Sequence, residues 1–147
     1  MNYLGLTLKL CLNVKEVFKR KKEIEEIKEK SIHLKDNKPS LTSEQLIAKR
    51  NIFEIINKKK FSTVVIDGVA RSGKTEVYFE AINKCLQERK QVLVLLPEIS
   101  MTTQWFDRFK KRFNSEPLLW HSDIKKSEKI KIWKSILDGN TNVVVGA

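Results

Sequence analysis

The stretch that decides the fold covers residues 62–75 and reads Ser-Thr-Val-Val-Ile-Asp-Gly-Val-Ala-Arg-Ser-Gly-Lys-Thr. It begins with residues 62–66, which are rich in β-branched side chains and favour a strand. It ends with residues 68–75, which fit the pattern G-x-x-x-x-G-K-[S/T] at every fixed position. This pattern cradles phosphates when it follows a strand and opens a helix. The stretch therefore predicts a phosphate-binding loop within a strand–loop–helix unit.

The residue types in this loop explain why it suits phosphate. Glycines at its two ends, Gly68 and Gly73, let the backbone turn its N–H groups inward, and the following helix adds partial positive charge. Lys74 can neutralise β- and γ-phosphates, and the Thr75 hydroxyl can ligate Mg²⁺. Arg71 is strained by ~1 kcal/mol or more if the backbone there needs a positive φ. Alternatively, its guanidinium reaches a phosphate itself. The alternative is a glycine-containing turn that matches the pattern by chance.

Strands and helices are expected to alternate along the rest of the chain. Apolar, β-branched runs predict strands, and segments of helical length lie between them. This alternation favours an α/β fold with a parallel sheet covered by helices on both faces. The expected strands are residues 62–66, 91–96, 118–120 and 143–145, and the expected helices are residues 74–88, 102–113 and 127–137.

The first part of the chain has a different character. Residues 14–31 form a charged, helix-favouring run without Gly or Pro, and residues 35–39 (Lys-Asp-Asn-Lys-Pro) are typical of a linker. A new helix is expected to begin near Thr42 and to end at Asn57. We therefore divide the chain into a helical linker segment at residues 1–40 and a domain at residues 41–147.

Composition narrows the class of protein. The chain has 147 residues, of which 41% are hydrophobic and 32% charged, so it can bury a core. It has no apolar run of the ~18 residues that would span a bilayer, and its two cysteines, Cys11 and Cys85, lack metal-ligand spacing. A cytoplasmic location is the expectation. The net charge of +11 suggests a polyanionic partner, although the charge excess is spread evenly and consists mostly of lysine.

Five segments together resemble one helicase family. They are Leu-Thr-Ser-Glu-Gln at 41–45, the loop with its flanks at 66–78, Val-Leu-Val-Leu-Leu-Pro-Glu-Ile-Ser at 92–100, His-Ser at 121–122 and Val-Val-Val-Gly-Ala at 143–147. In this order they resemble the PriA (primosomal protein N′) family of superfamily 2 DNA helicases, which act in replication restart. A phosphate loop alone is common to many ATPases, whereas this series is not.

The resemblance implies part of a RecA-like domain that binds ATP and Mg²⁺ and belongs to a 3′→5′ DNA helicase. It implies partners as well, namely single-stranded or forked DNA, the remaining helicase portions and primosome proteins. Gln45 would contact adenine, with Lys74 and Thr75 catalytic and Thr75 the Mg²⁺ ligand. The implied nucleotide-binding residues are Gln45, Gly68, Val69, Ala70, Arg71, Ser72, Gly73, Lys74 and Thr75, and the implied DNA-proximal residues are Pro97, Glu98, Thr103, Gln104 and His121.

The sequence also departs from the family pattern. Ala70 and Arg71 stand where the family usually has Thr-Gly. The series stops at Ala147, before the acidic motif that holds Mg²⁺ and positions the attacking water, and before the second motor lobe. The family's zinc-binding cysteines have no counterpart among the residues of this chain. The expectation is an internal helicase fragment with at most weak Mg-ATP binding, no helicase activity and negligible ATPase activity.

Two further functions stay open from the sequence. One is an unrelated P-loop enzyme such as a small-molecule kinase, and the other is a non-catalytic DNA-binding or decayed fragment that uses its positive charge. Trp105, Trp120 and Trp133 could stack on bases. Trp105 and Trp133 fall within amphipathic helices, which favours packing in the core or at a domain interface.

Overall fold

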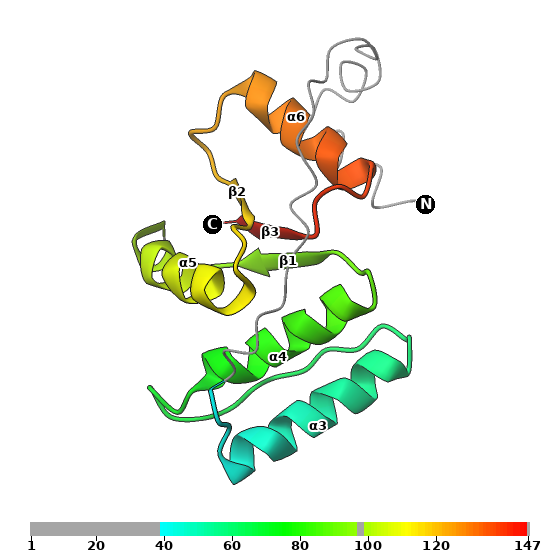
Figure 1. Cartoon of the computed structure of the whole chain (residues 1–147), viewed down its shortest axis with the longest axis vertical. Helices are drawn as coiled ribbons and strands as arrows, with labels where there is room; N and C mark the ends of the chain where they lie inside the picture. Colours follow the sequence, from blue (N-terminus) through cyan, green and yellow to red (C-terminus); the bar gives the residue numbers. More distant parts are fainter. Residues whose placement is uncertain (1–38, 97–98, 147) are drawn as a thin grey trace.

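The computed structural model describes residues 39–96 and 99–146 (Figure 1). The expected helical run at residues 14–31, nearly all of the expected linker segment, Pro97, Glu98 and Ala147 lie outside these described residues. Among the described residues, no helix is both long and apolar enough to cross a membrane.

The described sheet has three parallel strands, as the alternating pattern predicted. Strand β1 covers Val92–Leu95, β2 covers Leu118–Trp120 and β3 covers Val143–Gly146. Strand β3 lies in the centre, between β1 and β2, and pairs with both in parallel. Leu95 and Trp120 both align with Gly146, so the carboxyl ends of all three strands meet at one edge of the sheet.

The prediction of a strand at residues 62–66 was wrong. These residues carry no regular secondary structure, and all three strands of the described sheet lie elsewhere. Val64 and Val65 of this segment are exposed, Val65 to 85%, and the preceding residue, Phe61, is 98% exposed. β-Branched residues favour strands mainly because they pack on a half-buried, pleated surface. This segment has the composition of a strand without such a surface to pack on.

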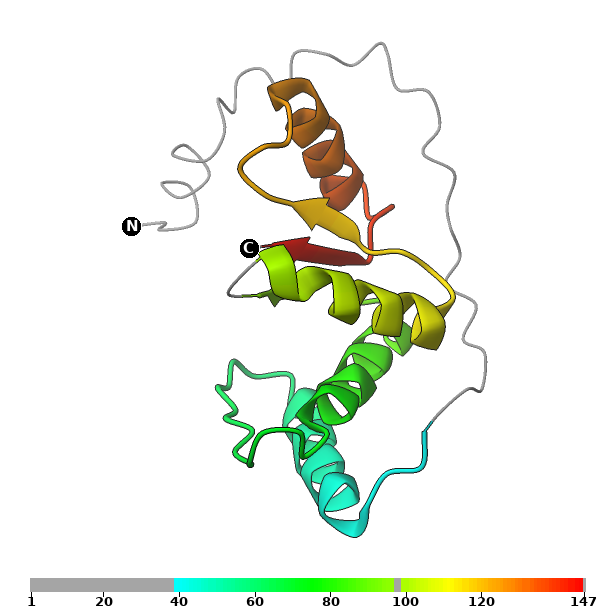
Figure 2. The same cartoon turned by 90° about the vertical axis from the view of Figure 1, so that its left-hand side faces the viewer.

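The described part of the chain contains four helices, at the places that the sequence indicated. They are α3 (Ser43–Asn57), α4 (Lys74–Gln87), α5 (Ile99–Phe113) and α6 (Lys126–Leu137). The two views place the strands between α6 on one side and α4 with α5 on the other (Figures 1 and 2). Helix α3 packs against α4, on the side of α4 away from the sheet (Figure 1).

One face of the sheet is covered by an aromatic core. Phe79 of α4 meets the ring of Trp105 edge-on at 5.5 Å and that of Phe113 at 5.7 Å, both from α5. These rings pack with Val143 and Val145 of β3, and Val145 is fully buried. Trp105 is only 6% exposed, which confirms that it packs in the core.

The opposite face is covered in part. Trp133 of α6 lies 6.2 Å from Trp120 of β2, centroid to centroid, whereas Leu93 and Leu95 of β1 are 65% and 74% exposed. The expectation of helices on both faces therefore holds for the middle of the sheet. At β1 only one face is covered, because Leu93 and Leu95 on the other face are exposed.

A buried carboxylate joins three helices. Glu80 of α4 is 4% exposed and accepts a hydrogen bond from Arg112 of α5, which is also buried. Its second oxygen lies 2.6 Å from the ammonium nitrogen of Lys49 on α3. One turn earlier on both helices, Arg108 pairs with Glu76 at 2.6 Å on the exposed surface. Glu80 therefore fixes α4 against α3 and α5 together.

We expect Arg112→Met to destabilise the fold by about 3 kcal/mol, because it leaves the buried Glu80 carboxylate with one cationic partner instead of two. Arg108→Met is the matched control, since it removes the equivalent exposed pair one turn away and is expected to cost under about 1 kcal/mol. Urea unfolding measures both free energies. Equal losses in the two variants would contradict the assignment of Glu80 as the junction of the three helices.

Candidate phosphate-binding site

The predicted phosphate loop lies immediately before helix α4, which begins at Lys74 as expected. Gly73 is the N-cap residue of this helix and has a φ of 80°, a left-handed conformation that favours glycine. A Cβ atom at Gly73 would also lie 2.3 Å from Nε2 of Gln45. The backbone therefore favours glycine at this position, and a larger residue would also displace the amide group of Gln45.

Arg71 has the positive φ that was predicted to strain a non-glycine residue in this loop. Its φ is 64°, so a side-chain-bearing residue adopts the left-handed region in the middle of the loop. This conformation costs roughly 1–2 kcal/mol relative to glycine. The Arg71 side chain is exposed and leaves the interior of the loop to Lys74.

Lys74 folds back into the loop that precedes it. Its ammonium nitrogen donates to the carbonyl oxygens of Gly68 at 2.5 Å and Val69 at 2.8 Å. The positive charge therefore lies beside the first turn of α4, whose unpaired N–H groups carry partial positive charge of their own. This arrangement attracts an anion that approaches the start of the helix.

Gln45 is brought to the loop from helix α3. Its Nε2 donates to the carbonyl oxygen of Ser72 at 2.9 Å, and its Oε1 accepts from the backbone N–H of Thr42 at 3.0 Å. The hydroxyl of Thr42 in turn accepts from the backbone N–H of Gln45, which completes a capping box. The spacing Thr-x-x-Gln is the sequence signal for the role of Gln45 in this capping box.

Thr75 has neighbours that sequence reasoning did not find. Its Oγ1 accepts a hydrogen bond from the Tyr78 hydroxyl at 3.3 Å, and the Tyr78 oxygen accepts one from Nε1 of Trp105 at 2.9 Å. Tyr78 lies one helical turn after Thr75, so that contact is readable from an i, i+3 spacing. The contact with Trp105 crosses from α4 to α5 and has no local signal.

The loop lies at the edge of the sheet where the strands end. Helix α4 connects through only four residues, 88–91, to the start of β1, so its N-terminus points toward the carboxyl end of that strand (Figure 1). His121 follows β2 at the same edge. Ligands of open α/β sheets bind at this edge.

The predicted DNA-proximal residues are only partly described. Thr103 and Gln104 are exposed on α5. His121 is half-buried, and its Nδ1 lies 3.9 Å from a carboxylate oxygen of Asp123, too far for a hydrogen bond. Within residues 39–96 and 99–146, no group of three His, Cys, Asp or Glu side chains is placed to hold a metal ion.

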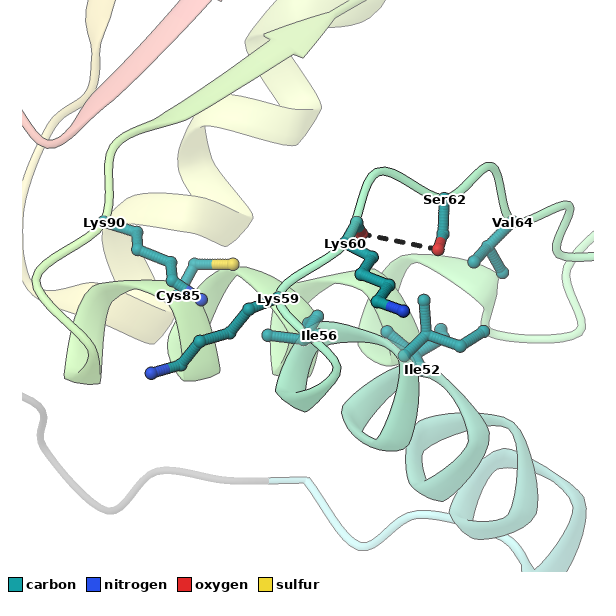
Figure 3. Close-up of a pocket in the computed structure, with 9 residues that line it drawn as sticks. Ile52, Ile56, Lys59, Lys60, Ser62, Val64, Cys85 and Lys90 are labelled. Carbon is teal, nitrogen blue, oxygen red and sulfur yellow. Dashed lines mark hydrogen bonds between the residues drawn. The ribbon is translucent and has the colours of Figure 1, made fainter.

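A separate cavity of about 530 Å³ lies between α3, α4 and the segment after α3 (Figure 3). No residue of the phosphate loop lines it. Burial raises the pKa of the Cys85 thiol at its wall. Lys90, which also lines the cavity, pairs with Glu88. Hydrogen bonds from Lys90 and Lys84 lower the pKa of Glu88 to about 2 and, reciprocally, Glu88 raises the pKa of Lys90. The lining residues are Ile52, Ile55, Ile56, Lys59, Lys60, Ser62, Val64, Cys85 and Lys90.

Comparison with known proteins gives relatives that agree with the motif series. The chain is similar to the replication restart protein PriA of Rickettsia felis, with 38% identity over 154 aligned positions that cover 100% of this chain and 21% of the relative. The PriA proteins of Bacillus subtilis (40% identity, 73% of this chain, 13% of the relative) and Haemophilus influenzae (36%, 76% and 15%) are similar as well. The chain thus spans about a fifth or less of the length of these relatives.

A family model described as "Type III restriction enzyme, res subunit" matches residues 38–146, which contain every described element and the whole phosphate loop. This match extends over most of the chain and agrees with the parallel sheet and flanking helices. The chain therefore belongs to the family of the type III restriction enzyme res subunit.

Proposed function

We propose that this chain supplies the ATP-phosphate-binding part of a DNA helicase of the replication-restart type. The observation that carries the proposal is the position of Lys74, whose ammonium group lies inside a glycine-bounded loop at the N-terminus of α4. A cation, the first-turn N–H groups and a flexible loop are what an oligophosphate needs. The similarity to replication restart proteins PriA gives the wider function.

Each group at the site has a role in this proposal. The Lys74 ammonium group exchanges its two carbonyl partners for β- and γ-phosphate oxygens. The residues fit Mg²⁺ through the Thr75 hydroxyl, a hard oxygen ligand of the kind that this ion prefers. An Mg²⁺ ion held by Thr75 would neutralise negative charge on the phosphates. Gln45 holds the loop through Ser72 and keeps one amide hydrogen for adenine.

We extend the proposal to the whole domain. Residues 41–147 form part of the first, ATP-binding lobe of a RecA-like motor, and residues 1–40 link it to an adjoining region. Hydrolysis also requires an acidic group for Mg²⁺ and a group that positions water. In this proposal, other portions of the complete helicase provide these groups, as well as the zinc site and the contacts with primosome proteins.

Single-stranded DNA is the proposed polymer substrate. Thr103 and Gln104 expose polar side chains on α5, which directly follows the carboxyl end of β1, and His121 follows β2 at the same edge. Pro97 and Glu98 are assigned to this DNA path by the family resemblance. The net charge of +11 favours association with the phosphate backbone.

A calorimetric titration with Mg-ATP tests the nucleotide site. We expect saturable binding by the wild-type chain and a loss of at least about tenfold in affinity for Lys74→Ala, because a charge-assisted contact with phosphate is worth roughly 1.5–3 kcal/mol. Lys131→Ala, which removes an exposed lysine of α6, is the matched control and should bind as the wild type does. Binding that survives Lys74→Ala unchanged would refute the assigned phosphate site.

A second titration, with a single-stranded oligonucleotide, tests the DNA path. Gln104→Ala is expected to weaken DNA binding about threefold to tenfold, the effect of one or two lost hydrogen bonds. The affinity for Mg-ATP should stay unchanged. Gln87→Ala removes another exposed glutamine, at the end of α4, and serves as the control. Equal effects of the two variants would argue against a DNA path along α5.

A non-catalytic DNA-binding module is the second candidate, and the positive charge is the observation that favours it. Such a module binds DNA with a steep dependence on salt concentration and without a response to nucleotide. Fluorescence anisotropy with labelled DNA, with and without Mg-ATP, separates the two functions. In the helicase proposal, nucleotide changes the DNA affinity of the wild type and does not change that of Lys74→Ala.

A further inference from the structure

We propose that Tyr78 and Trp105 are positioning residues that orient the Thr75 hydroxyl toward Mg²⁺. The proposal rests on the proposed function, because it concerns the same nucleotide site. It assigns a role to two aromatic residues outside the phosphate-loop motif. Their contacts run in one line, from the indole of Trp105 through the phenol of Tyr78 to the hydroxyl of Thr75.

The direction of the hydrogen bonds follows from the chemistry of the groups. The indole nitrogen of Trp105 can only donate, so the Tyr78 oxygen accepts at 2.9 Å. The single phenolic hydrogen of Tyr78 is then free to donate to Oγ1 of Thr75 at 3.3 Å, which is at the long end for two hydroxyl groups. Thr75 therefore accepts from Tyr78 with one lone pair, and its second lone pair stays available for a cation.

The aromatic core holds this chain of hydrogen bonds in place. Trp105 is 6% exposed and stacks on Phe109, with ring centroids 5.0 Å apart and planes inclined by 24°. Tyr78 and Trp105 both contact the ring of Phe79 edge-on, at 5.4 Å and 5.5 Å. Because the indole cannot move without disturbing the core, the orientation of the phenol is fixed from its buried end.

The hydrogen bonds from Trp105 through Tyr78 act only on the Thr75 hydroxyl, the proposed ligand of Mg²⁺. Lys74 contacts the carbonyl groups of Gly68 and Val69, and none of these groups contacts Tyr78 through the hydrogen bonds described for them. Removal of the Tyr78 hydroxyl therefore leaves the phosphate contacts of Lys74 in place and frees the Thr75 hydroxyl to rotate. The variant should therefore lose affinity for ATP only when Mg²⁺ is present.

The test measures the affinity for ATP in excess Mg²⁺ and in EDTA, for the whole chain. Tyr78→Phe keeps the ring and removes only the oxygen. We expect it to reduce the gain in affinity that Mg²⁺ gives by about threefold to tenfold, which corresponds to one hydrogen bond. Its affinity in EDTA should stay within about twofold of the wild type. Trp105→Phe should change the Mg²⁺-dependent gain in the same direction, whereas Trp133→Phe, the matched control in α6, should not.

The outcomes separate this inference from the function on which it rests. A wild type that does not bind ATP in either condition overturns the proposed function and the inference with it. If the wild type binds ATP and Mg²⁺ increases the ATP affinity of Tyr78→Phe as much as that of the wild type, the inference alone is overturned. An equal loss in Mg²⁺ and in EDTA also overturns it, because that result indicates a purely structural role. Circular dichroism confirms that each variant is folded.

Discussion

The arrangement of the site depends on the neutralisation of one buried carboxylate. Glu80 lies in the middle of α4, away from water, and a charge in such a place is tolerated only with close cationic partners. Those partners come from two other helices, Lys49 of α3 and Arg112 of α5. The contact thereby sets the position of α4, and α4 begins with Lys74 and Thr75. It also brings α3 and α5 against α4, so that Gln45 of α3 contacts the loop at Ser72 and Trp105 of α5 contacts Tyr78 of α4.

Local patterns were sufficient for most elements of the fold. The start of α4 at Lys74 and the capped start of α3 follow from glycine and Thr-x-x-Gln signals within a few residues of each helix end. Residues 62–66 show where such signals stop being informative. Their β-branched composition is equally local, but a strand exists only where it pairs with another strand, and residues 62–66 pair with none of the three strands of the described sheet.

In the candidate site, too, the residues that are close in sequence were predictable, whereas the contacts between distant residues were not. The loop and its lysine are contiguous in sequence, so residue types and spacing predicted them. The groups that support the loop lie 27 residues away in both cases, Gln45 from Ser72 and Trp105 from Tyr78, and such pairs come together only through the packing of helices. Arg71 is intermediate, since the motif locates it in the loop whereas its φ of 64° required the structure. Its left-handed backbone is the feature of this loop that glycine would relieve.

The most direct test of the account is a titration of the ¹⁵N-labelled chain with Mg-ATP, followed by the backbone amide signals. The account predicts that the largest shifts fall on Gly73, Lys74 and Thr75, with smaller shifts along the preceding loop, because these N–H groups face the phosphates. Shifts concentrated instead at the cavity lined by Ile52, Cys85 and Lys90, or spread over the exposed lysines, would contradict it. Such a result would mean that nucleotide associates with this chain through its charge and not through a phosphate loop.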